Sequence, residues 1–291
     1  MKRTLPPGTA NVMEASAIVA DARFRQSLAQ YCEKMAEPAP AGWPLRKLLN
    51  QLERYYSAYM LIGQYYGWRN HGAAVPNLSR LQAISGQSPR HTASFCRMLQ
   101  TRNLISIETL QADRRQKVLR PAERLIREVG RSCAAFVQAH DLVAGSALAL
   151  PFEQDAGILG EMIFLSSARV QGAGTVIAEF PTVLRLAGYD SGYPLLAALM
   201  LSHYRRAAGK EGISLTHGAL AERFQVSESH VGNVLGHMRQ VRALLACGPQ
   251  EFRVTEEVVD EFEHWCAAEM AHYADLAQRA MAYPESCPPR T

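Results

Sequence analysis

The sequence predicts a mainly α-helical protein in which one unit, two short helices followed by a small β-hairpin, occurs twice. Three observations support this prediction. Two segments, Leu81–Ile105 and Leu220–Leu244, align without a gap at a spacing of 139 residues. Each contains two amphipathic runs joined by a turn that ends in Ser. Each is followed by a short segment that is rich in strand-forming residues on both sides of polar turn residues.

The second run of each copy is predicted to be a helix that begins at a Ser cap. Ser88 and Ser227 precede the runs, and Pro89 suits a first helical turn. Residues at helical spacing are small or apolar in both copies, which predicts a core-facing stripe. The stripe consists of Thr92, Phe95, Cys96 and Leu99 in the first copy and of Val231, Val234, Leu235 and Met238 in the second.

The flanking elements are expected in the same order in both copies. A long helix from Trp43-Pro44 to about Trp68 precedes the first copy. Strands at Ile105–Leu110 and Gln116–Leu119 follow it, and then a helix from Pro121 to about Leu142. The second copy repeats this plan with a leading helix after Phe180-Pro181, a helix pair at Leu215–Phe224 and Glu228–Gln240, a hairpin within Leu245–Val254 and a closing helix over Thr255–Ala282.

This order of elements is that of the winged helix-turn-helix fold, in which the second helix enters the DNA major groove and the hairpin is the wing. We therefore expect two such domains, at 41–145 and 178–283, packed through their long terminal helices as a pseudo-dimer. The remaining parts are an N-terminal arm and helix at 1–40, an apolar helical linker at 146–177 and a flexible tail at 284–291.

Charge is distributed unequally between the two copies. The net charge of the chain is +4. From Arg69 to Arg131, twelve basic residues stand against four acidic ones, a balance of +8. From Glu211 to Arg279, five basic residues stand against eleven acidic ones, a balance of −6. A basic surface is what DNA binding requires, so the first domain is expected to carry most of the DNA affinity.

Candidate DNA-binding residues lie on the polar face of each second helix and on the first wing. Arg side chains read guanine edges or bind phosphates, and an Arg on a wing is attracted by a narrow minor groove. In the first copy the candidates are Ser88, Arg90, His91, Ser94, Arg97 and Thr101 on the helix and Arg114, Arg115 and Lys117 on the wing; in the second they are Ser229, His230, Asn233 and His237. The second wing, Gly248–Glu251, has no cation.

The first copy resembles the MarR family of transcriptional regulators over about Leu45–Leu142. The resemblance rests on LSRLQAISGQSPRHTASFCRMLQTRNLI and on the wing ADRRQKVLRPAERLI, where Asp113, Arg114, Arg115, Leu119 and Pro121 match. It implies that Arg115 enters the minor groove and that the helix from Ser88 to Arg97 enters the major groove. Ordinary members are single-domain dimers, so a tandem form departs from the family pattern.

Four aromatic residues of the helix before the first copy have two interpretations. Tyr55, Tyr59, Tyr66 and Trp68 could line a pocket for a small aromatic effector, or they could pack an interface between the repeats. The packing interpretation is favoured. Cys96 lies on the predicted core stripe, so we expect a buried, unreactive thiol and not a redox sensor.

The remaining patterns argue against other classes of protein. Neither a complete nucleotide-binding or nucleophile motif nor a His or Cys ligand pair is present, so we expect no enzyme, metal or cofactor. Apolar runs are too short for a membrane span, and we expect a cytoplasmic protein with no membrane partner.

Together these observations predict a sequence-specific transcriptional regulator that binds double-stranded DNA as a monomeric pseudo-dimer or a homodimer. The alternatives are a plasmid-type replication initiator and a tandem winged-helix module that binds proteins.

Overall fold

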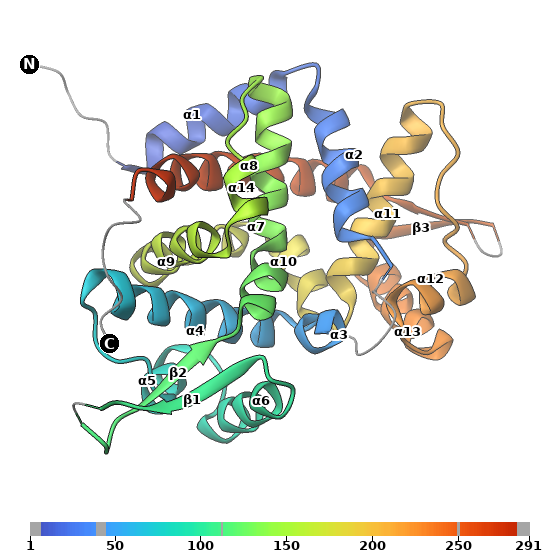
Figure 1. Ribbon diagram of the computed structural model, residues 1–291. Coiled ribbons are helices and arrows are strands. Elements are labelled where there is room, and N and C mark those ends of the chain that lie inside the picture. The colour runs from blue at the N-terminus through green and yellow to red at the C-terminus, as the bar shows by residue number, and fades with distance from the viewer. Residues whose placement is uncertain (1–6, 39–44, 112, 249–250, 284–291) are drawn as a thin grey trace, which may run out of the picture. The chain divides into compact units, whose positions relative to one another are not determined.

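The computed structural model describes residues 7–38, 45–111, 113–248 and 251–283 (Figure 1). The described chain is mainly α-helical and contains two separate antiparallel hairpins, as the sequence predicts. It divides into two compact units, each assembled from separate stretches of the chain. Unit 1 takes residues from 1–51, 135–147 and 175–274, and unit 2 takes residues from 52–134, 148–174 and 275–291.

Unit 2 contains the first copy of the repeat together with later helices. Its elements are α4 (Leu52–His71), α5 (Leu78–Ile84), α6 (Pro89–Thr101), β1 (Ile105–Thr109), β2 (Lys117–Pro121), the first part of α7 (Glu123–Ala144), α8 (Leu150–Gln154), α9 (Ala156–Ala173) and the end of α14 (Glu256–Met281). Helix α4 packs along α9 on one side and against α5 and β2 on another (Figure 1).

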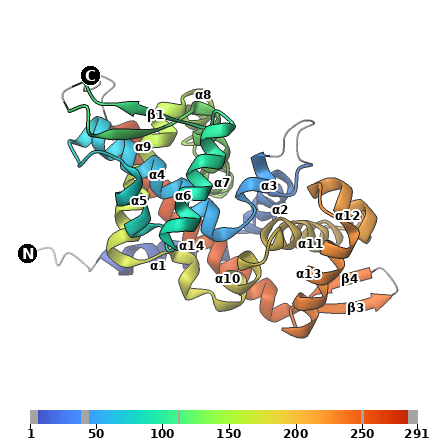
Figure 2. The same ribbon diagram turned by 90° about the horizontal axis from the view of Figure 1, so that it is seen from below.

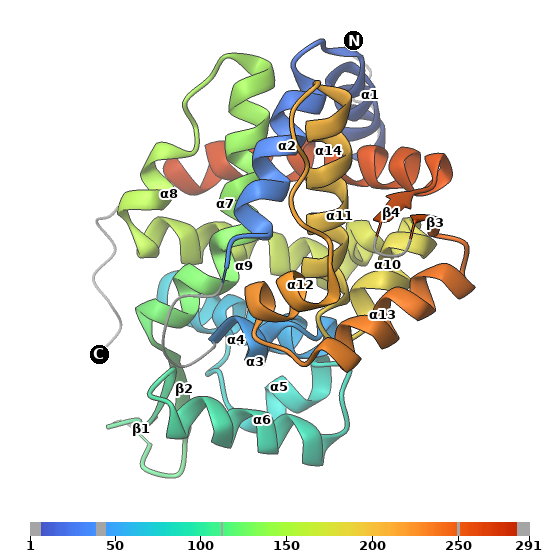
Figure 3. The ribbon, with the colours of Figure 1, turned by 90° about the vertical axis from the view of Figure 1, so that its right-hand side faces the viewer.

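Unit 1 contains the second copy of the repeat together with earlier helices. Its elements are α1 (Pro7–Ala20), α2 (Phe24–Met35), α3 (Leu45–Leu49), the 3₁₀ helix η1 (Val176–Glu179), α10 (Pro181–Gly188), α11 (Gly192–Ala207), α12 (His217–Phe224), α13 (Glu228–Gln240), β3 (Leu244–Gly248), β4 (Glu251–Val254), most of α14 and the end of α7. Helix α11 packs along α2, and α13 lies beside the β3–β4 hairpin (Figures 2 and 3).

Glycines allow α4 and α9 to approach closely in unit 2. A Cβ atom on Gly160 of α9 would lie 2.2 Å from the ring of Tyr66 on α4. In the other direction, a Cβ on Gly63 of α4 would lie 2.1 Å from Oγ of Ser167 on α9. Because real Cβ atoms do not approach other atoms so closely, each glycine makes room for a side chain of the opposite helix.

An aromatic cluster forms the centre of unit 1. Phe136, at the end of α7, stacks on Tyr31 of α2 with ring centroids 4.3 Å apart. The same ring meets Trp265 of α14 edge-on at 5.5 Å. Leu28 of α2 is also fully buried. The core of unit 1 therefore draws on α2, α7 and α14, which are far apart in the sequence.

The predicted helix and strand boundaries hold closely within the repeats and differ outside them. The N-terminal region, expected as an arm and one helix, contains α1 and α2. The expected start of the leading helix of the first copy, at Trp43-Pro44, lies outside the described residues. The rest of that expected helix is two helices, since the chain leaves helical geometry between α3 and α4. The leading helix of the second copy is likewise divided into α10 and α11, with Ser191 in the left-handed region at φ 59°. These breaks lie between segments that each keep helical periodicity, which is why a periodicity argument joins them.

Pro121 does not begin a helix, contrary to the expectation. It pairs with Ile105 at the end of the β1–β2 ladder, and the amide of Ala122 donates to Leu104 O at 2.8 Å. A proline is tolerated at a strand end because no ladder bond there needs its missing N–H. Helix α7 begins two residues later, at Glu123.

We predict that Gly160→Ala lowers the free energy of unfolding by about 1–3 kcal/mol, because the added methyl group overlaps the buried Tyr66 ring. Urea denaturation of the two proteins measures this difference. Gly172→Ala is the matched control on the same helix, since its Cβ meets no heavy atom within 4 Å. The control should keep or raise stability; an equal loss in both variants would contradict the packing account.

We predict a pH-dependent stability that depends on Glu269 of α14. Burial raises the pKa of Glu269 to about 7 from 4.5, although Trp265 Nε1 donates to its carboxylate at 3.1 Å. Because the folded-state pKa is raised, this contribution to stability is present below about pH 4.5 and is lost as pH rises through about 7. Urea unfolding measures the free energy of unfolding at pH 5 and at pH 8. The difference between these two values should be smaller in Glu269→Gln than in the wild type by about 1–3 kcal/mol. An unchanged difference would contradict the prediction.

Candidate nucleic-acid interface

Helix α6 has the cap and the buried stripe that the sequence predicts. The Ser88 hydroxyl accepts a hydrogen bond from the amide of His91 at 3.3 Å, and Pro89 occupies the first turn. The predicted stripe of Thr92, Phe95, Cys96 and Leu99 is buried. Ser85, the residue that ends α5, also joins the two helices, because its hydroxyl lies 2.8 Å from that of Thr92. Contacts on the buried side of α6 thus fix its orientation.

The opposite face of α6 is exposed throughout. The side chains on it are those expected from the sequence: Ser88, Arg90, His91, Ser94, Arg97 and Thr101. Their described polar contacts are local, since Thr101 Oγ1 donates to Arg97 O at 2.9 Å and Arg97 Nε reaches Ala93 O at 3.5 Å. The side chains able to reach a ligand therefore project from one continuous helix face.

The β1–β2 hairpin carries a turn organised by a carboxylate. One oxygen of Asp113 accepts from the Arg115 amide at 3.0 Å, and the other accepts from Gln116 Nε2 at 3.1 Å. The described hydrogen bond between Asp113 and Arg115 is thus to the backbone of Arg115 and not to its side chain. This Asx-type turn holds the chain while the three cations Arg114, Arg115 and Lys117 stay exposed.

Some cations of unit 2 pair with carboxylates: Arg120 of β2 with Glu108 at 3.3 Å and Arg127 of α7 with Glu123 at 2.7 Å. Among the described residues, by contrast, no carboxylate forms an ion pair with five exposed cations of α6 and the β1–β2 hairpin. These five are Arg90, Arg97, Arg114, Arg115 and Lys117, and we call them the unpaired cation group.

Helix α13 repeats the framework of α6 but uses its polar face differently. Ser227 caps it by accepting from the His230 amide at 3.2 Å, and its predicted stripe is buried. The His230 ring lies 2.9 Å from Asp190 O, and the His237 ring packs on Tyr189 at 5.1 Å. Two of the four candidate residues of the second copy are thus in contact with the turn between α10 and α11.

The other two candidates of the second copy, Ser229 and Asn233, are exposed. Ser229 follows Glu228, an exposed carboxylate in the first turn of α13. A carboxylate at that position repels a phosphate group. The face of α13 therefore offers no described cation at its N-terminal end, where α6 offers Arg90.

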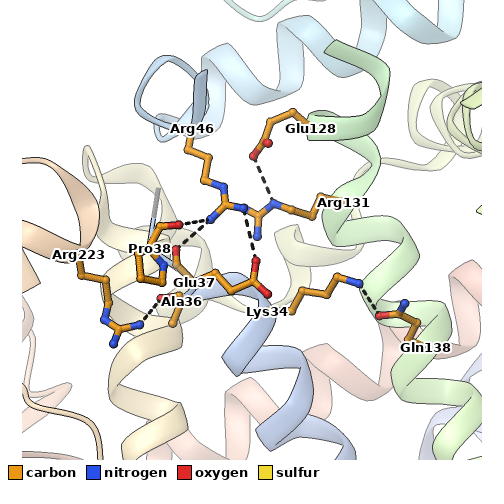
Figure 4. Close-up of polar contacts among 9 residues, drawn as sticks. All are labelled: Lys34, Ala36, Glu37, Pro38, Arg46, Glu128, Arg131, Gln138 and Arg223. Carbon is orange, nitrogen blue, oxygen red and sulfur yellow. Dashed lines mark hydrogen bonds and ion pairs between the residues drawn. The ribbon is translucent and has the colours of Figure 1, made fainter. Parts of the chain in front are cut away.

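Helix α12 also forms a hydrogen bond to another part of unit 1 that the sequence did not predict. Arg223 donates to Ala36 O at 2.8 Å, beyond the end of α2 (Figure 4). Arg46 holds the next residues of the same segment by donating to Glu37 O at 2.9 Å and Pro38 O at 3.0 Å (Figure 4). Carbonyl acceptors carry no sequence signal, so no pattern in the chain could have revealed these bonds.

The aromatic residues of α4 are engaged with the protein itself. The Tyr55 hydroxyl donates to Val129 O at 2.9 Å, and the Tyr66 hydroxyl donates to Ala156 O at 3.3 Å. Tyr59 is buried, and Trp68 packs near Tyr65 with ring centroids 6.1 Å apart. Hydroxyls that bond backbone carbonyls are not free to orient a ligand. These contacts lie within unit 2, whereas the packing interpretation placed the aromatic residues between the repeats.

The Cys96 thiol is buried on the inner face of α6, and burial raises its pKa to about 11. Such a thiol is protonated at neutral pH and reacts slowly, because the thiolate is the reactive form. Within the described parts of the chain, no group of three or more His, Cys, Asp or Glu side chains is arranged to hold a metal ion. Nor does any described helix have the length and apolar character to cross a membrane.

Comparisons with known proteins add no relative. No protein-family model matches the chain, and neither the curated proteins nor the solved structures contain a significant match.

We predict that Asp113→Ala speeds amide hydrogen exchange at Arg115 on the order of five-fold, because a net hydrogen bond of about 1 kcal/mol is lost. Asp113→Asn keeps an oxygen acceptor and should exchange at close to the wild-type rate. Exchange followed residue by residue at constant pH measures both. Equal acceleration in the two variants would show that the carboxylate acts through charge and not through the turn.

Proposed function

We propose that this protein is a cytoplasmic transcriptional regulator that binds duplex DNA through two winged helix-turn-helix domains, with the first domain providing most of the affinity. The order α4, α5, α6, β1, β2 and α7 supports the assignment of the first domain, and the order α11, α12, α13, β3, β4 and α14 supports the second. In this proposal α6 lies in the major groove and the β1–β2 hairpin is the wing over the minor groove.

The unpaired cation group is the observation that carries the proposal. Cations that already pair with a carboxylate gain less from a phosphate, because the existing partner must be given up. The five exposed side chains on α6 and the hairpin have no such described partner. They lie on elements that contact each other, since α6 packs against β1 (Figures 1 and 3). Exposed positive charge, which duplex DNA requires, is thus present on both elements that the proposal places against DNA.

The contacts of α13 support a lower DNA affinity for the second domain than for the first. His230 and His237 contact Asp190 and Tyr189, and Glu228 lies at the helix start. DNA contact by this helix would require those contacts to be replaced and the Glu228 repulsion to be overcome. We therefore propose that the second domain reads DNA weakly and acts mainly as a structural partner of the first. The DNA site is then expected to have one half that is bound strongly and one that is bound weakly.

The fastening of α12 and α13 also favours one alternative, a tandem winged-helix module that binds a protein. In that alternative the second domain is a scaffold and the first domain's cations meet an acidic protein surface. A replication initiator is the other alternative, and it would recognise repeated origin sequences. Sequence specificity and salt dependence distinguish the three, because counterion release from duplex DNA makes binding steeply dependent on salt.

We predict that Arg115→Ala weakens binding to a selected duplex by about 1–3 kcal/mol and lowers the slope of log K against log salt by about 1. Arg115 is exposed on the hairpin, and its amide is bonded to Asp113. Fluorescence anisotropy titrations at several salt concentrations measure both quantities.

Two controls accompany that measurement. Arg127→Ala removes a cation of unit 2 that is already paired with Glu123, and Asn233→Ala removes an exposed side chain of α13. Both should bind DNA within about 0.5 kcal/mol of the wild type, as ordinary surface substitutions do. If Arg127→Ala weakened binding as much as Arg115→Ala, non-specific charge would explain the affinity. If Asn233→Ala did so, the asymmetry would be wrong.

A further inference from the structure

Each compact unit is completed by helices from the opposite half of the chain. The halves meet at residues 144–147, which are exposed and include Gly145 at φ 71°. Unit 2 combines α4–α6 and the β1–β2 hairpin of the first half with α8, α9 and residues 275–283 of the second. Unit 1 combines α10–α13 and the β3–β4 hairpin of the second half with α1–α3 and residues 135–147 of the first.

In unit 2, the second half of the chain packs on α4, the helix that precedes α5. Helix α9 fills the glycine positions of α4, and its buried Glu161 accepts from Asn70 Nδ2 at 2.8 Å and pairs with His71. The Tyr283 hydroxyl, just past α14, donates to Asn70 O at 2.6 Å. The last turn of α4 is thus held by side chains from two separate segments of the second half.

In unit 1 the first half plays the equivalent role. Helix α2 packs along α11, and Glu33 pairs with Arg205 at 2.5 Å. The buried carboxylate Glu263 of α14 pairs with Arg25 at 3.0 Å. Arg223 of α12 bonds Ala36 O, as described above. Polar and apolar contacts of the second copy therefore both depend on the first 50 residues.

We propose that residues 1–147 and 148–291 are mutual binding partners, and that neither half forms its helix-turn-helix unit without the other. A half chain alone would leave Leu28 and its neighbours on α2, or the glycine-lined face of α4, without the helix that buries it. In the second half alone, Glu161 and Glu263 would both lack the partners that the first half provides. This inference is independent of DNA binding, since it concerns the folding of the chain.

Hydrogen exchange on the intact chain tests where the effect of a substitution appears. Gly160→Ala changes the second half, and the proposal predicts lost protection in α4–α6 of the first half. Leu28→Ala changes the first half, and lost protection is expected in α11–α13 of the second. Gly172→Ala, which meets nothing within 4 Å, is the control and should change neither. Loss confined to the half that carries the substitution would overturn the proposal.

A second experiment cuts the folded chain, so that a destabilised variant is not required. A protease site is inserted between Ser146 and Ala147, which are both exposed, and the purified full-length protein is cleaved. The two fragments should elute together at the mass of the intact chain and keep its protection pattern. After separation in denaturant, each should refold only when mixed with the other. A fragment that regains the protected α4–α6 or α11–α13 alone would overturn the proposal.

Discussion

The close packing of α4 against α9 is the constraint on which unit 2 depends. Gly63 and Gly160 let the two helices meet at a distance that no other residue permits. Helix α4 in turn packs against α5 and β2, and the Leu119 amide donates to Pro76 O at 2.8 Å in the connection to α5. The packing of α4 against α9 therefore helps to determine the position of α6 and of the hairpin cations, although these residues take no part in it.

Much of unit 2 could be predicted from the sequence, because local rules determine it. Ser88 marks the start of α6, and the spacing of Thr92, Phe95 and Leu99 identifies its buried face. The two copies support the same buried face, since different residues keep the same pattern at equivalent positions. The exposed face follows by elimination, and with it the candidate residues of the first copy.

The parts that could not be predicted depend on contacts between distant segments. Nothing near Arg223 indicates that it bonds Ala36 O, and nothing near His230 indicates Asp190 O as its neighbour. The composition of each unit from both halves is likewise absent from any local pattern. Propensity and periodicity identify an element and its buried face, but not the segment that covers that face. Pro121 shows the limit at short range, because pairing with Ile105 outweighed its preference for a first helical turn.

The central claim is that one surface of unit 2 recognises duplex DNA by sequence. The most direct test is to incubate the full-length protein with random genomic duplex fragments at several salt concentrations and to sequence the retained pool. The account predicts a steep loss of retention with salt and an enriched motif with one strong half. Weak retention that varies little with salt, with no enriched motif, would contradict the account and would direct attention to a protein partner.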